Sequence, residues 1–315
     1  MPVRVGVIGV GYLGRHHARI YSELENAELV GVADVDSRRS EEIAKTYGCK
    51  AFPSYPEVIA ACDALSIVTP TVTHHDIAMD CLRAGKDILI EKPITEDMDE
   101  ARDIIEEAEK NNRVLQVGHL ERYNPGIVAA IEMIKEPRFI ESERLSPFLG
   151  RGTDVDVTLD LMIHDLDIVM SITKSRIKDI KAIGEAVLTE KIDVAKVWLE
   201  FDNGCKALIT ASRLASDKQR KLRVFQKDAY ISVDYQSQEV RRYFKTSSGI
   251  SFDVVKPESK EPLKEELRDF IYCVENRKKP RVSGIEAMEA LEVALRITEI
   301  LKMTQQDHQG LKAGQ

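Results

Sequence analysis

Residues 1–121 alternate between short apolar segments rich in β-branched residues and longer segments with helical periodicity. The apolar segments are nearly continuous in their hydrophobicity, and each is followed by a helical segment. Strands of this kind belong to parallel sheets that helices cover on both faces. Ser37 and Thr95 stand where the N-caps of two of these helices are expected. The pattern predicts an α/β, doubly wound domain with strands at residues 3–9, 28–36, 64–70, 87–93 and 113–119.

After about Tyr123 the pattern changes to helices mixed with segments of β character, which indicates an α+β domain. The Asp-Asn-Gly sequence at 202–204 lies between two such segments and predicts a hairpin turn. We therefore expect an N-terminal Rossmann dinucleotide-binding domain over residues 1–121. Residues 122–315 are expected to form a C-terminal α+β domain with a large, mainly antiparallel open sheet. Because such a sheet exposes apolar surface, we expect a homodimer or homotetramer that assembles through it.

The composition disfavours several classes of protein. The 315 residues carry a formal net charge of −8, and nucleic-acid binding needs a basic face. No apolar run is long enough to cross a bilayer, and the first residues lead directly into a strand. The five cysteines lie far apart without any Cys-x-x-Cys pair, which suits free thiols in a reducing compartment. We expect a cytoplasmic protein that binds neither nucleic acid nor membrane.

A glycine-rich turn follows the first strand in the sequence GVIGVGYLGRHHA. Its Gly-x-Gly-x-x-Gly spacing permits a tight turn, a close approach of a pyrophosphate, and close packing of the following helix. An acid at the end of the second strand can accept hydrogen bonds from a ribose hydroxyl, and it would repel the 2′-phosphate of NADP. The expected cofactor is therefore NAD, although Arg38 and Arg39 leave NADP as the alternative. The cofactor residues predicted here are Gly9, Gly11, Tyr12, Leu13, Gly14, Asp34 and Arg39.

The fourth apolar strand ends in an unusual way, in the sequence DILIEKPIT. Glu91, Lys92 and Pro93 follow its last apolar residue. Ligands of doubly wound sheets bind beyond the carboxyl ends of the strands, so Lys92 is expected near the cofactor. Its ammonium group could polarise a hydroxyl or carbonyl oxygen while a hydride moves. The alternative is a surface lysine paired with Glu91.

A second candidate cluster lies in the segment DVTLDLMIHDLDIVM, which has the pattern of a largely apolar helix. Asp160 and His164 are four residues apart and therefore share one helix face. A carboxylate beside an imidazole is the arrangement of a general base and its supporting group. The alternatives are a structural histidine or a metal site, but no further residues have metal-ligand spacing, so no metal is expected.

Taken together, these segments resemble the Gfo/Idh/MocA family of oxidoreductases over nearly the whole chain. The resemblance rests on GVIGVGYLGRHHA, SIVTPTVTHHDIA, GKDILIEKPIT, VLQVGHLERYNP and DLMIHDLD. It implies that Lys92, Asp160 and His164 act at the substrate. It also implies that Glu91 and Lys92 lie near the cofactor. The same is implied for Thr69 and Pro70, which end a strand, and for His74, which follows them. Finally, it implies a cis Lys92–Pro93 bond that aims the lysine.

The reaction implied by the resemblance is NAD-dependent oxidation of a ring secondary alcohol. Asp160 would support His164 as that histidine removes the hydroxyl proton, and Lys92 would hydrogen-bond the substrate oxygen. The residues leave open whether Lys92 or His164 is the base. His16 and His17, which follow the glycine-rich turn, are expected on a helix surface or at a domain contact.

The substrate is expected to be a sugar or, more specifically, a nucleotide sugar. VGHLERYNPGI and the segment from residue 145 to 170 resemble a subgroup of UDP-N-acetylglucosamine 3-dehydrogenases. Many family members have a glycine-rich stretch before the Asp-x-x-x-His helix, and its absence here argues against a monosaccharide or inositol. Arg144 and Arg151 could meet a diphosphate. The predicted substrate residues are Lys92, His119, Arg122, Tyr123, Asn124, Arg151, Asp160 and His164.

Two alternatives remain at the level of sequence. One is an inositol, polyol or other sugar dehydrogenase or reductase of the same family, with NADP as a possible cofactor. The other is a non-catalytic dinucleotide-binding sensor. The joint presence of Lys92, Asp160 and His164 favours an enzyme over the sensor.

Overall fold

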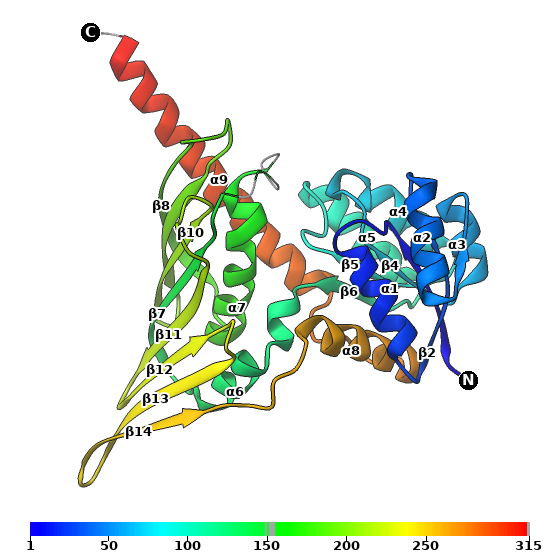
Figure 1. Cartoon of the computed structure of the whole chain (residues 1–315). Coiled ribbons are helices and arrows are strands. Elements are labelled where there is room, and N and C mark those ends of the chain that lie inside the picture. Colours follow the sequence, from blue (N-terminus) through cyan, green and yellow to red (C-terminus); the bar gives the residue numbers. More distant parts are fainter. Residues whose placement is uncertain (149, 151–154, 314–315) are drawn as a thin grey trace. The chain divides into compact units, whose positions relative to one another are not determined.

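The computed structural model describes residues 1–148, 150 and 155–313, which form two compact units (Figure 1). Unit 1 comprises Met1–Leu120 and Glu261–Met288, and unit 2 comprises Glu121–Lys260 and the chain from Glu289 onward. The sequence pattern assigns residues 261–288 to the second domain, whereas the structure places them in the first. The reason is hydrophobic burial, because Leu267 and Phe270 belong to the same buried cluster as Val5.

Unit 1 is built on a six-stranded sheet in which every neighbouring pair of strands is parallel. Its order is β3-β2-β1-β4-β5-β6, which is the order of a Rossmann domain. Five strands match the predicted segments, and the sixth, β3, has two residues and no periodicity that could reveal it. The strands are β1 (Val3–Ile8), β2 (Ala27–Ala33), β3 (Lys50–Ala51), β4 (Ala64–Ile67), β5 (Asp87–Glu91) and β6 (Leu115–Gly118).

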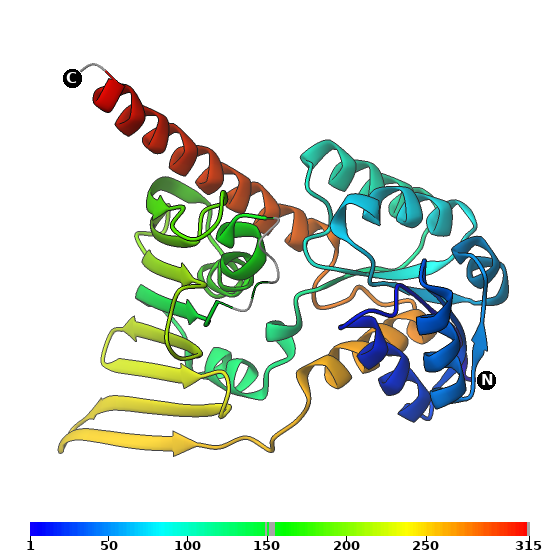
Figure 2. The same cartoon turned by 45° about the horizontal axis from the view of Figure 1, so that its top comes forward.

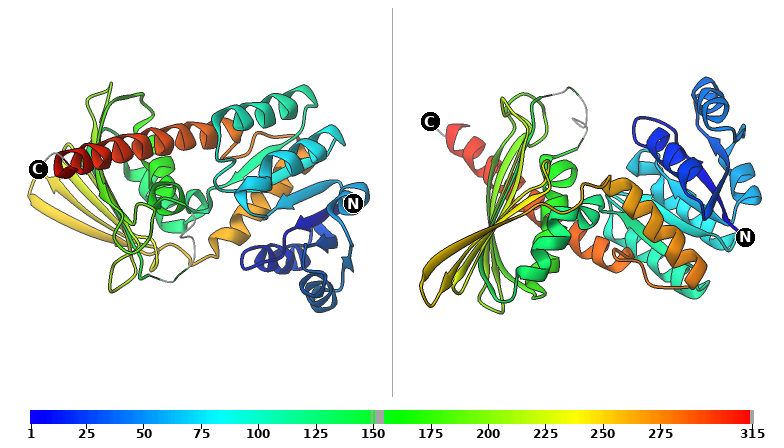
Figure 3. Two further views of the ribbon diagram at one scale, coloured as in Figure 1. Left: turned by 90° about the horizontal axis from the view of Figure 1, so that it is seen from above. Right: turned by 60° about the horizontal axis from the view of Figure 1, so that its bottom comes forward.

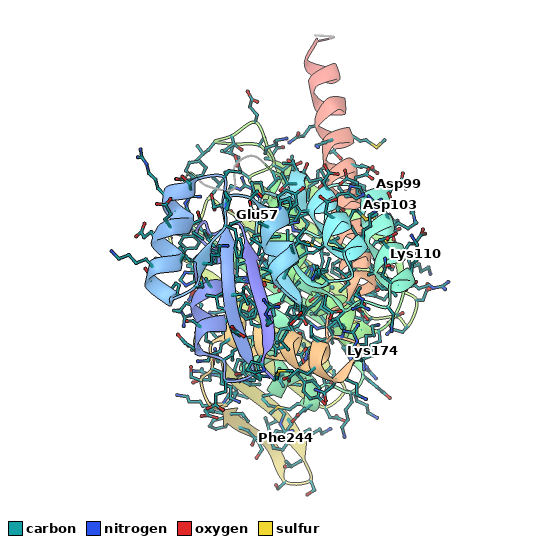
Figure 4. All side chains as sticks on the ribbon, turned by 90° about the vertical axis from the view of Figure 1, so that its right-hand side faces the viewer. Glu57, Asp99, Asp103, Lys110, Lys174 and Phe244 are labelled. Atoms are coloured by element: carbon teal, nitrogen blue, oxygen red, sulfur yellow. The ribbon has the colours of Figure 1, made fainter. Side chains whose placement is uncertain are left out.

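Helices cover both faces of this sheet, as predicted. They are α1 (Gly14–Glu23), α2 (Ser37–Tyr47), α3 (Tyr55–Ala61), α4 (His74–Arg83), α5 (Met98–Lys110) and α8 (Pro262–Asn276). Helices α1, α2 and α8 share a buried cluster with alternate residues of β1, and α4 and α5 lie on the other face (Figure 2). Charged side chains such as Asp99, Asp103 and Lys110 project from the exposed side of α5 (Figure 4).

The caps of two helices differ from the prediction by one or two residues. Asp36, rather than Ser37, accepts the N–H of Arg38 at the start of α2. Asp97, rather than Thr95, accepts two N–H groups at the start of α5. In both cases the carboxylate also suits the positive end of the helix dipole.

Unit 2 contains an eight-stranded, mainly antiparallel sheet in the order β14-β13-β12-β11-β7-β10-β9-β8. Only the β7–β10 pair among these neighbours is parallel, so the predicted fold class is confirmed. The strands are β7 (Pro137–Leu145), β8 (Ile177–Glu185), β9 (Val194–Phe201), β10 (Lys206–Ser212), β11 (Gln219–Gln226), β12 (Ala229–Asp234), β13 (Glu239–Thr246) and β14 (Gly249–Val255).

Helices α6 (Pro125–Met133) and α7 (Ile163–Thr173) lie on one face of this second sheet (Figure 3). Helix α9 (Gly284–Ala313) begins in unit 1 and continues in unit 2, where Thr298 hydrogen-bonds Thr158. The buried face of β9 carries Ala195, Val197, Leu199 and Phe201, and polar or aromatic residues alternate with them. This alternation identifies a sheet with one core face and one outward face.

A row of six aromatic rings crosses the outward face of the sheet. Consecutive ring centroids are 4.9 to 5.9 Å apart, in the range of favourable aromatic pairs. The row runs through Trp198, Phe139, Phe225, Tyr230, Tyr243 and Phe252. Ile183, Ile250 and Phe252 are exposed towards its two ends. The outward face is therefore more apolar than an ordinary solvated sheet surface.

Candidate active site

The glycine-rich turn links β1 to α1 at the carboxyl edge of the parallel sheet. Gly9 has a φ of +85°, which L-residues with a side chain rarely adopt. A Cβ at Gly14 would lie 1.9 Å from the carbonyl oxygen of Gly9, so only glycine allows α1 to start here. A Cβ at Gly11 would meet nothing closer than Arg39 at 4.0 Å. The turn is therefore closely packed at Gly9 and Gly14, whereas at Gly11 there is room beside the backbone.

The start of α1 suits an anion. No side chain caps this helix, so the positive end of its dipole has no capping carboxylate, although the N–H groups of Arg15 and His16 donate to the carbonyls of Gly11 and Leu13. Tyr12 and Leu13 are exposed beside the turn. These features fit the phosphates of a dinucleotide, as predicted for Gly9 to Gly14.

Asp34 ties the end of β2 to the glycine-rich turn. One carboxylate oxygen accepts the N–H of Val10 at 2.8 Å, and the other accepts the N–H of Asp36 at 2.9 Å. Arg39 approaches the same carboxylate at 3.3 Å. Asp34 thus lies beside the glycine-rich turn with Arg39 next to it, and its contact with a ribose hydroxyl stays a prediction.

His74 joins two loops at the carboxyl edge of the sheet. Its Nε2 lies 2.9 Å from the carbonyl oxygen of Thr69, and its Nδ1 lies 3.0 Å from that of Pro93. The side chain is buried, and burial lowers the pKa of His74, although the hydrogen-bonded carbonyls act in the opposite direction. Pro70 is exposed and Thr69 half-buried in the loop that His74 holds. His74 thus lies between the two loops that are predicted to be near the cofactor, and their contact with a cofactor stays a prediction.

Glu91 is the last residue of β5, the second strand from one edge of the sheet, and Lys92 follows it. The Glu91 carboxylate is buried, and its Oε2 accepts the N–H of Lys92 at 3.2 Å. Its Oε1 lies 3.1 Å from Nε2 of His17. The Lys92–Pro93 bond is cis, as the family resemblance implies.

The expectation for His17 is wrong, because its side chain is fully buried within unit 1. Besides Glu91, it contacts Ser66 of β4, whose Oγ lies 3.2 Å from Nδ1. The hydroxyl of Tyr21 lies 2.8 Å from the same Oγ. The sequence contains one signal of this burial. His17 and Tyr21 are four residues apart on α1 and therefore share one helix face. His119, at the end of β6, is also buried in unit 1.

In unit 2, Asp160 and His164 lie on one continuous helical segment with an unexpected start. Residues Thr158–Met162 form a π-helical turn, η3, in which the N–H of Ile163 donates to the carbonyl of Thr158. Such wide turns are rare and occur frequently at functional sites. Asp160 lies in η3 and His164 in the first turn of α7, and both are half-buried. The sequence predicts an ordinary helix here, and its pattern contains no signal for the wider turn.

A buried ionic cluster fixes α7 to the sheet. Asp165, next to His164, accepts hydrogen bonds from Arg144 at 2.6 Å and from Ser142 at 2.7 Å. Arg144 also bonds Glu121 at 3.0 Å, and Tyr235 donates to Asp165 at 3.3 Å. Burial alone would lower the pKa of Arg144, but Asp165 and Glu121 outweigh it and raise the pKa. We call Glu121, Ser142, Arg144, Asp165 and Tyr235 the Arg144 cluster.

The structure corrects two predicted substrate contacts. Arg144 is 1% exposed and bound to two carboxylates, so it does not reach a diphosphate. Asn124 is buried as the N-cap of α6, where its oxygen accepts the N–H of Gly126. Its amide donates to the carbonyl of Tyr235 and to Glu121, which leaves it a structural role.

The remaining predicted substrate residues lie at the start of unit 2. The guanidinium of Arg122 pairs with Asp167 of α7 at 3.1 Å, and Tyr123 is buried. Arg151 lies outside the described residues. Within the described part of the chain, no group of three or more His, Cys, Asp or Glu side chains is arranged to hold a metal ion. None of the helices described there combines the length and hydropathy of a membrane span.

Comparisons with known proteins agree with this architecture. Residues 3–119 match a profile described as the Gfo/Idh/MocA oxidoreductase family with an NAD-binding Rossmann fold. Residues 137–232 match the C-terminal domain of the same group. The chain belongs to the Gfo/Idh/MocA oxidoreductase family. The predicted family, the NAD-binding Rossmann domain and the dehydrogenase class are therefore confirmed.

Within this family, the chain is 37% identical to the UDP-N-acetylglucosamine 3-dehydrogenase of Acidithiobacillus ferrooxidans, over 94% of this chain and 96% of that relative. A solved structure of that enzyme superimposes with a TM-score of 0.93 at 36% identity, covering 96% of this chain and 98% of that one. The scyllo-inositol 2-dehydrogenase (NAD(+)) of Bacillus subtilis is 28% identical over 94% of this chain and 93% of its own length.

Proposed function

We propose that the protein is an NAD-dependent dehydrogenase that oxidises the 3-hydroxyl of UDP-N-acetylglucosamine to a ketone. The observation that carries this proposal is the similarity to the UDP-N-acetylglucosamine 3-dehydrogenase, at 37% identity and a TM-score of 0.93 over nearly the whole of both chains. Oxidation of an inositol is the second candidate, because the inositol dehydrogenase relative also aligns along the full chain.

The residues of unit 1 fit the dinucleotide. The uncapped start of α1 and the open side of Gly11 suit the pyrophosphate, and the Asp34 carboxylate suits a ribose diol. We favour NAD over NADP because a 2′-phosphate would meet the Asp34 carboxylate. Arg39 would have to leave Asp34 before it could bind that phosphate. Bound NAD supplies the hydride acceptor of the reaction.

The proposed chemistry divides the work among three side chains. Lys92, at the end of β5, donates a hydrogen bond to the substrate oxygen as negative charge develops there. His164, in the first turn of α7, and Asp160, one turn earlier, are the proposed acid–base pair of unit 2. Either Lys92 or His164 accepts the hydroxyl proton, and Asp160 stabilises the charged imidazole when the histidine does so. His119, Arg122 and Tyr123 are proposed to line the sugar side.

We also propose that the outward face of the unit 2 sheet packs against a second copy of the chain. The six-ring aromatic row and the exposed Ile250 and Phe252 supply a large apolar surface. Ion pairs on the same face, such as Arg223 with Glu143, would lie at a polar rim. Light scattering that returns the mass of a monomer would reject this dimer or tetramer.

The five cysteines are free thiols, four of them buried, which supports a reducing compartment such as the cytoplasm. This placement is part of the proposal. It is tested by the distribution of the native protein between cell fractions, and recovery from an oxidising compartment would contradict it.

The deciding experiment follows NADH formation by absorbance. Purified protein is mixed with NAD or NADP and, in turn, with UDP-N-acetylglucosamine, myo-inositol, scyllo-inositol and glucose. Turnover with NAD and the nucleotide sugar alone is the expected result, turnover with an inositol alone would support the second candidate, and cofactor binding without any turnover would indicate the sensor.

Replacement of the proposed catalytic lysine sharpens this assay. Lys92→Ala is expected to lower kcat by about 10²–10³-fold, the usual loss of one donor to a developing oxyanion. The Kd for NADH, measured by fluorescence, should hardly change because the glycine-rich turn is untouched. Unchanged kcat would remove Lys92 from the proposed mechanism.

A further inference from the structure

Two buried histidines lie on either side of Lys92, and neither belongs to the proposed catalytic set. His17 of α1 contacts the side chain of Glu91, the residue before Lys92. His74 of α4 contacts the carbonyl oxygens of Pro93 and Ile94, the residues after it. Lys92 itself is half-buried. The short turn that carries the lysine is therefore held at both ends by imidazole rings from two different helices.

On the His17 side, the chemistry of the partners sets the direction of every hydrogen bond. An ionised carboxylate only accepts, so Nε2 of His17 must donate to Glu91. In a neutral ring Nδ1 then accepts, and Ser66 donates to it. The Ser66 oxygen in turn accepts from Tyr21. Each donor in this series of hydrogen bonds has one acceptor. The four side chains that form it, those of His17, Glu91, Ser66 and Tyr21, are buried.

Glu91 is confined on its other side by a glycine. A Cβ at Gly118 would lie 2.8 Å from Oε2 of Glu91, so this glycine leaves just enough room for the carboxylate. That same Oε2 accepts the backbone N–H of Lys92. The bond from His17 is thus transmitted to the main chain of Lys92 through a single, tightly packed carboxylate.

On the His74 side, the ring bridges two strand ends. Nδ1 lies 3.0 Å from the oxygen of Pro93 and 3.2 Å from that of Ile94, and Nε2 lies 2.9 Å from the oxygen of Thr69. Thr69 follows β4, and Pro93 follows β5. Carbonyl oxygens only accept and a neutral imidazole carries one N–H, so His74 donates either to Thr69 or to Pro93 and Ile94. The buried ring packs between the Thr69–Pro70 loop and the turn that contains Lys92.

Burial of this much polar surface stabilises the fold less than apolar packing would. A buried polar group costs free energy that its hydrogen bonds only offset, whereas an apolar side chain would fill the same space without that cost. A fully satisfied buried network, however, restricts its members to one arrangement. Rigid placement is what a donor to a developing oxyanion requires.

We propose that His17 and His74 form a brace that positions Lys92 for catalysis. The inference rests on the proposed role of Lys92 at the substrate oxygen. His17 acts through Glu91, and His74 acts through the carbonyls of Pro93 and Ile94, so both are positioning residues. Ser66 and Tyr21 complete the His17 side of the brace.

The first test compares His17→Leu with His17→Gln. Leucine removes both hydrogen bonds, and the kcat is expected to fall by about 10²-fold, the loss that a misplacement of about 1 Å can cause. The KM for NAD should stay near the wild-type value, because the glycine-rich turn is intact. Glutamine can donate to Glu91 and accept from Ser66, so it should restore most of the kcat. Equal kcat in the Leu and Gln variants would overturn the proposal.

A second readout follows Lys92 without catalysis. The rate at which trinitrobenzenesulfonate labels the Lys92 amine is measured by peptide mapping, with Lys92→Arg as the blank. We expect several-fold faster labelling in His17→Leu and His74→Leu, since a released amine is more exposed, and a near wild-type rate in His17→Gln. His75→Leu, which changes the neighbouring half-buried histidine on α4, is the matched control and should label like the wild type.

The two proposals fail separately. Full turnover by Lys92→Ala would reject the catalytic role of the lysine, and the labelling rates would still report on the brace. If Lys92→Ala is inactive while the Leu variants keep the wild-type kcat and labelling rate, the brace is wrong. Circular dichroism checks folding, and if His17→Leu does not fold, His17→Asn replaces it. Asparagine is too short to bond both Glu91 and Ser66, so it should behave as leucine does.

Discussion

The two units hold their candidate catalytic residues by different physical means. In unit 1, Lys92 follows a strand end, and the bonds that fix its turn run to main-chain atoms and to one neighbouring carboxylate. In unit 2, α7 carries His164, and the adjacent Asp165 is bound to the fully buried guanidinium of Arg144. One site is therefore built on backbone geometry, and the other is anchored by buried charge.

This difference determines how each site should respond to damage. Hydrogen bonds to backbone carbonyls contribute modestly one by one, and their loss misplaces a side chain more than it unfolds a domain. A buried ion pair that loses one partner leaves an uncompensated charge, which is strongly destabilising. We therefore expect the loss of a backbone contact in the Lys92 turn to reduce function before stability, and variants of the Arg144 cluster to do the reverse.

The largest effect on stability is expected from Arg144→Met. It leaves Asp165 buried without its cation, whereas Glu121 keeps its pair with Arg220 at 3.2 Å. The free energy of unfolding of unit 2 should fall by about 3–5 kcal/mol. The chain has a single tryptophan, Trp198 on β9, so tryptophan fluorescence during urea unfolding reports on this unit. The control is Arg241→Met in the same unit, whose exposed pair with Glu239 should contribute far less to stability. Equal losses in the two variants would contradict the contrast.

An intermediate effect should separate two glycines of the same turn. At Gly14 a Cβ would overlap the carbonyl of Gly9, so Gly14→Ala should cost about 1–3 kcal/mol of stability as well as NADH affinity. At Gly11 there is room for a Cβ in the free protein. Gly11→Ala should therefore melt like the wild type while its Kd for NADH rises. Calorimetry and cofactor fluorescence measure the two quantities, and a Gly11→Ala variant with normal affinity would argue against a pyrophosphate at this position.

The smallest effect is a dependence of stability on pH. Burial lowers the pKa of His74 below its ordinary value of 6.5, so the unfolded chain binds that proton more tightly than the folded one. The stability linked to neutral His74 is present above pH 6.5 and is lost as the pH falls below that value. The melting temperature of His74→Gln should thus decline less than that of the wild type as the pH is lowered. His16, whose pKa burial also lowers, remains in both proteins and cancels in the comparison. Parallel declines would show that His74 does not carry this effect.

The parts of the site that can be predicted from the sequence are those that depend on local backbone requirements. Gly9 and Gly14 indicate a tight turn because a side chain at either position would be strained or would overlap the backbone. Lys92 can be recognised because it directly follows an apolar strand. Asp34 is found in the same way, at the end of β2. The π-helical turn at Asp160 could not be predicted, because its hydrogen-bond pattern leaves no mark in hydrophobic periodicity.

The wrong predictions share one cause, because the residues concerned have partners that are distant in the sequence. His17 looks like a surface residue until β4 and β5 bring Ser66 and Glu91 against α1. Arg144 looks like a ligand for a diphosphate until the sheet places it beneath α7. Asn124 has the composition of a binding residue, yet the fold uses it as a helix cap.

The sequence by itself determined the fold class, the dinucleotide turn and the location of Lys92, Asp160 and His164 along the chain. These features follow from short-range rules of periodicity, strand ends and glycine conformation, which act within a few residues. Tertiary structure alone decided that residues 261–288 complete unit 1, that two histidines enclose the turn of Lys92, and that Arg144 is buried. Burial and long-range hydrogen bonding depend on which segments meet in space, and a polar side chain carries no local sign of whether its partner will be water or protein.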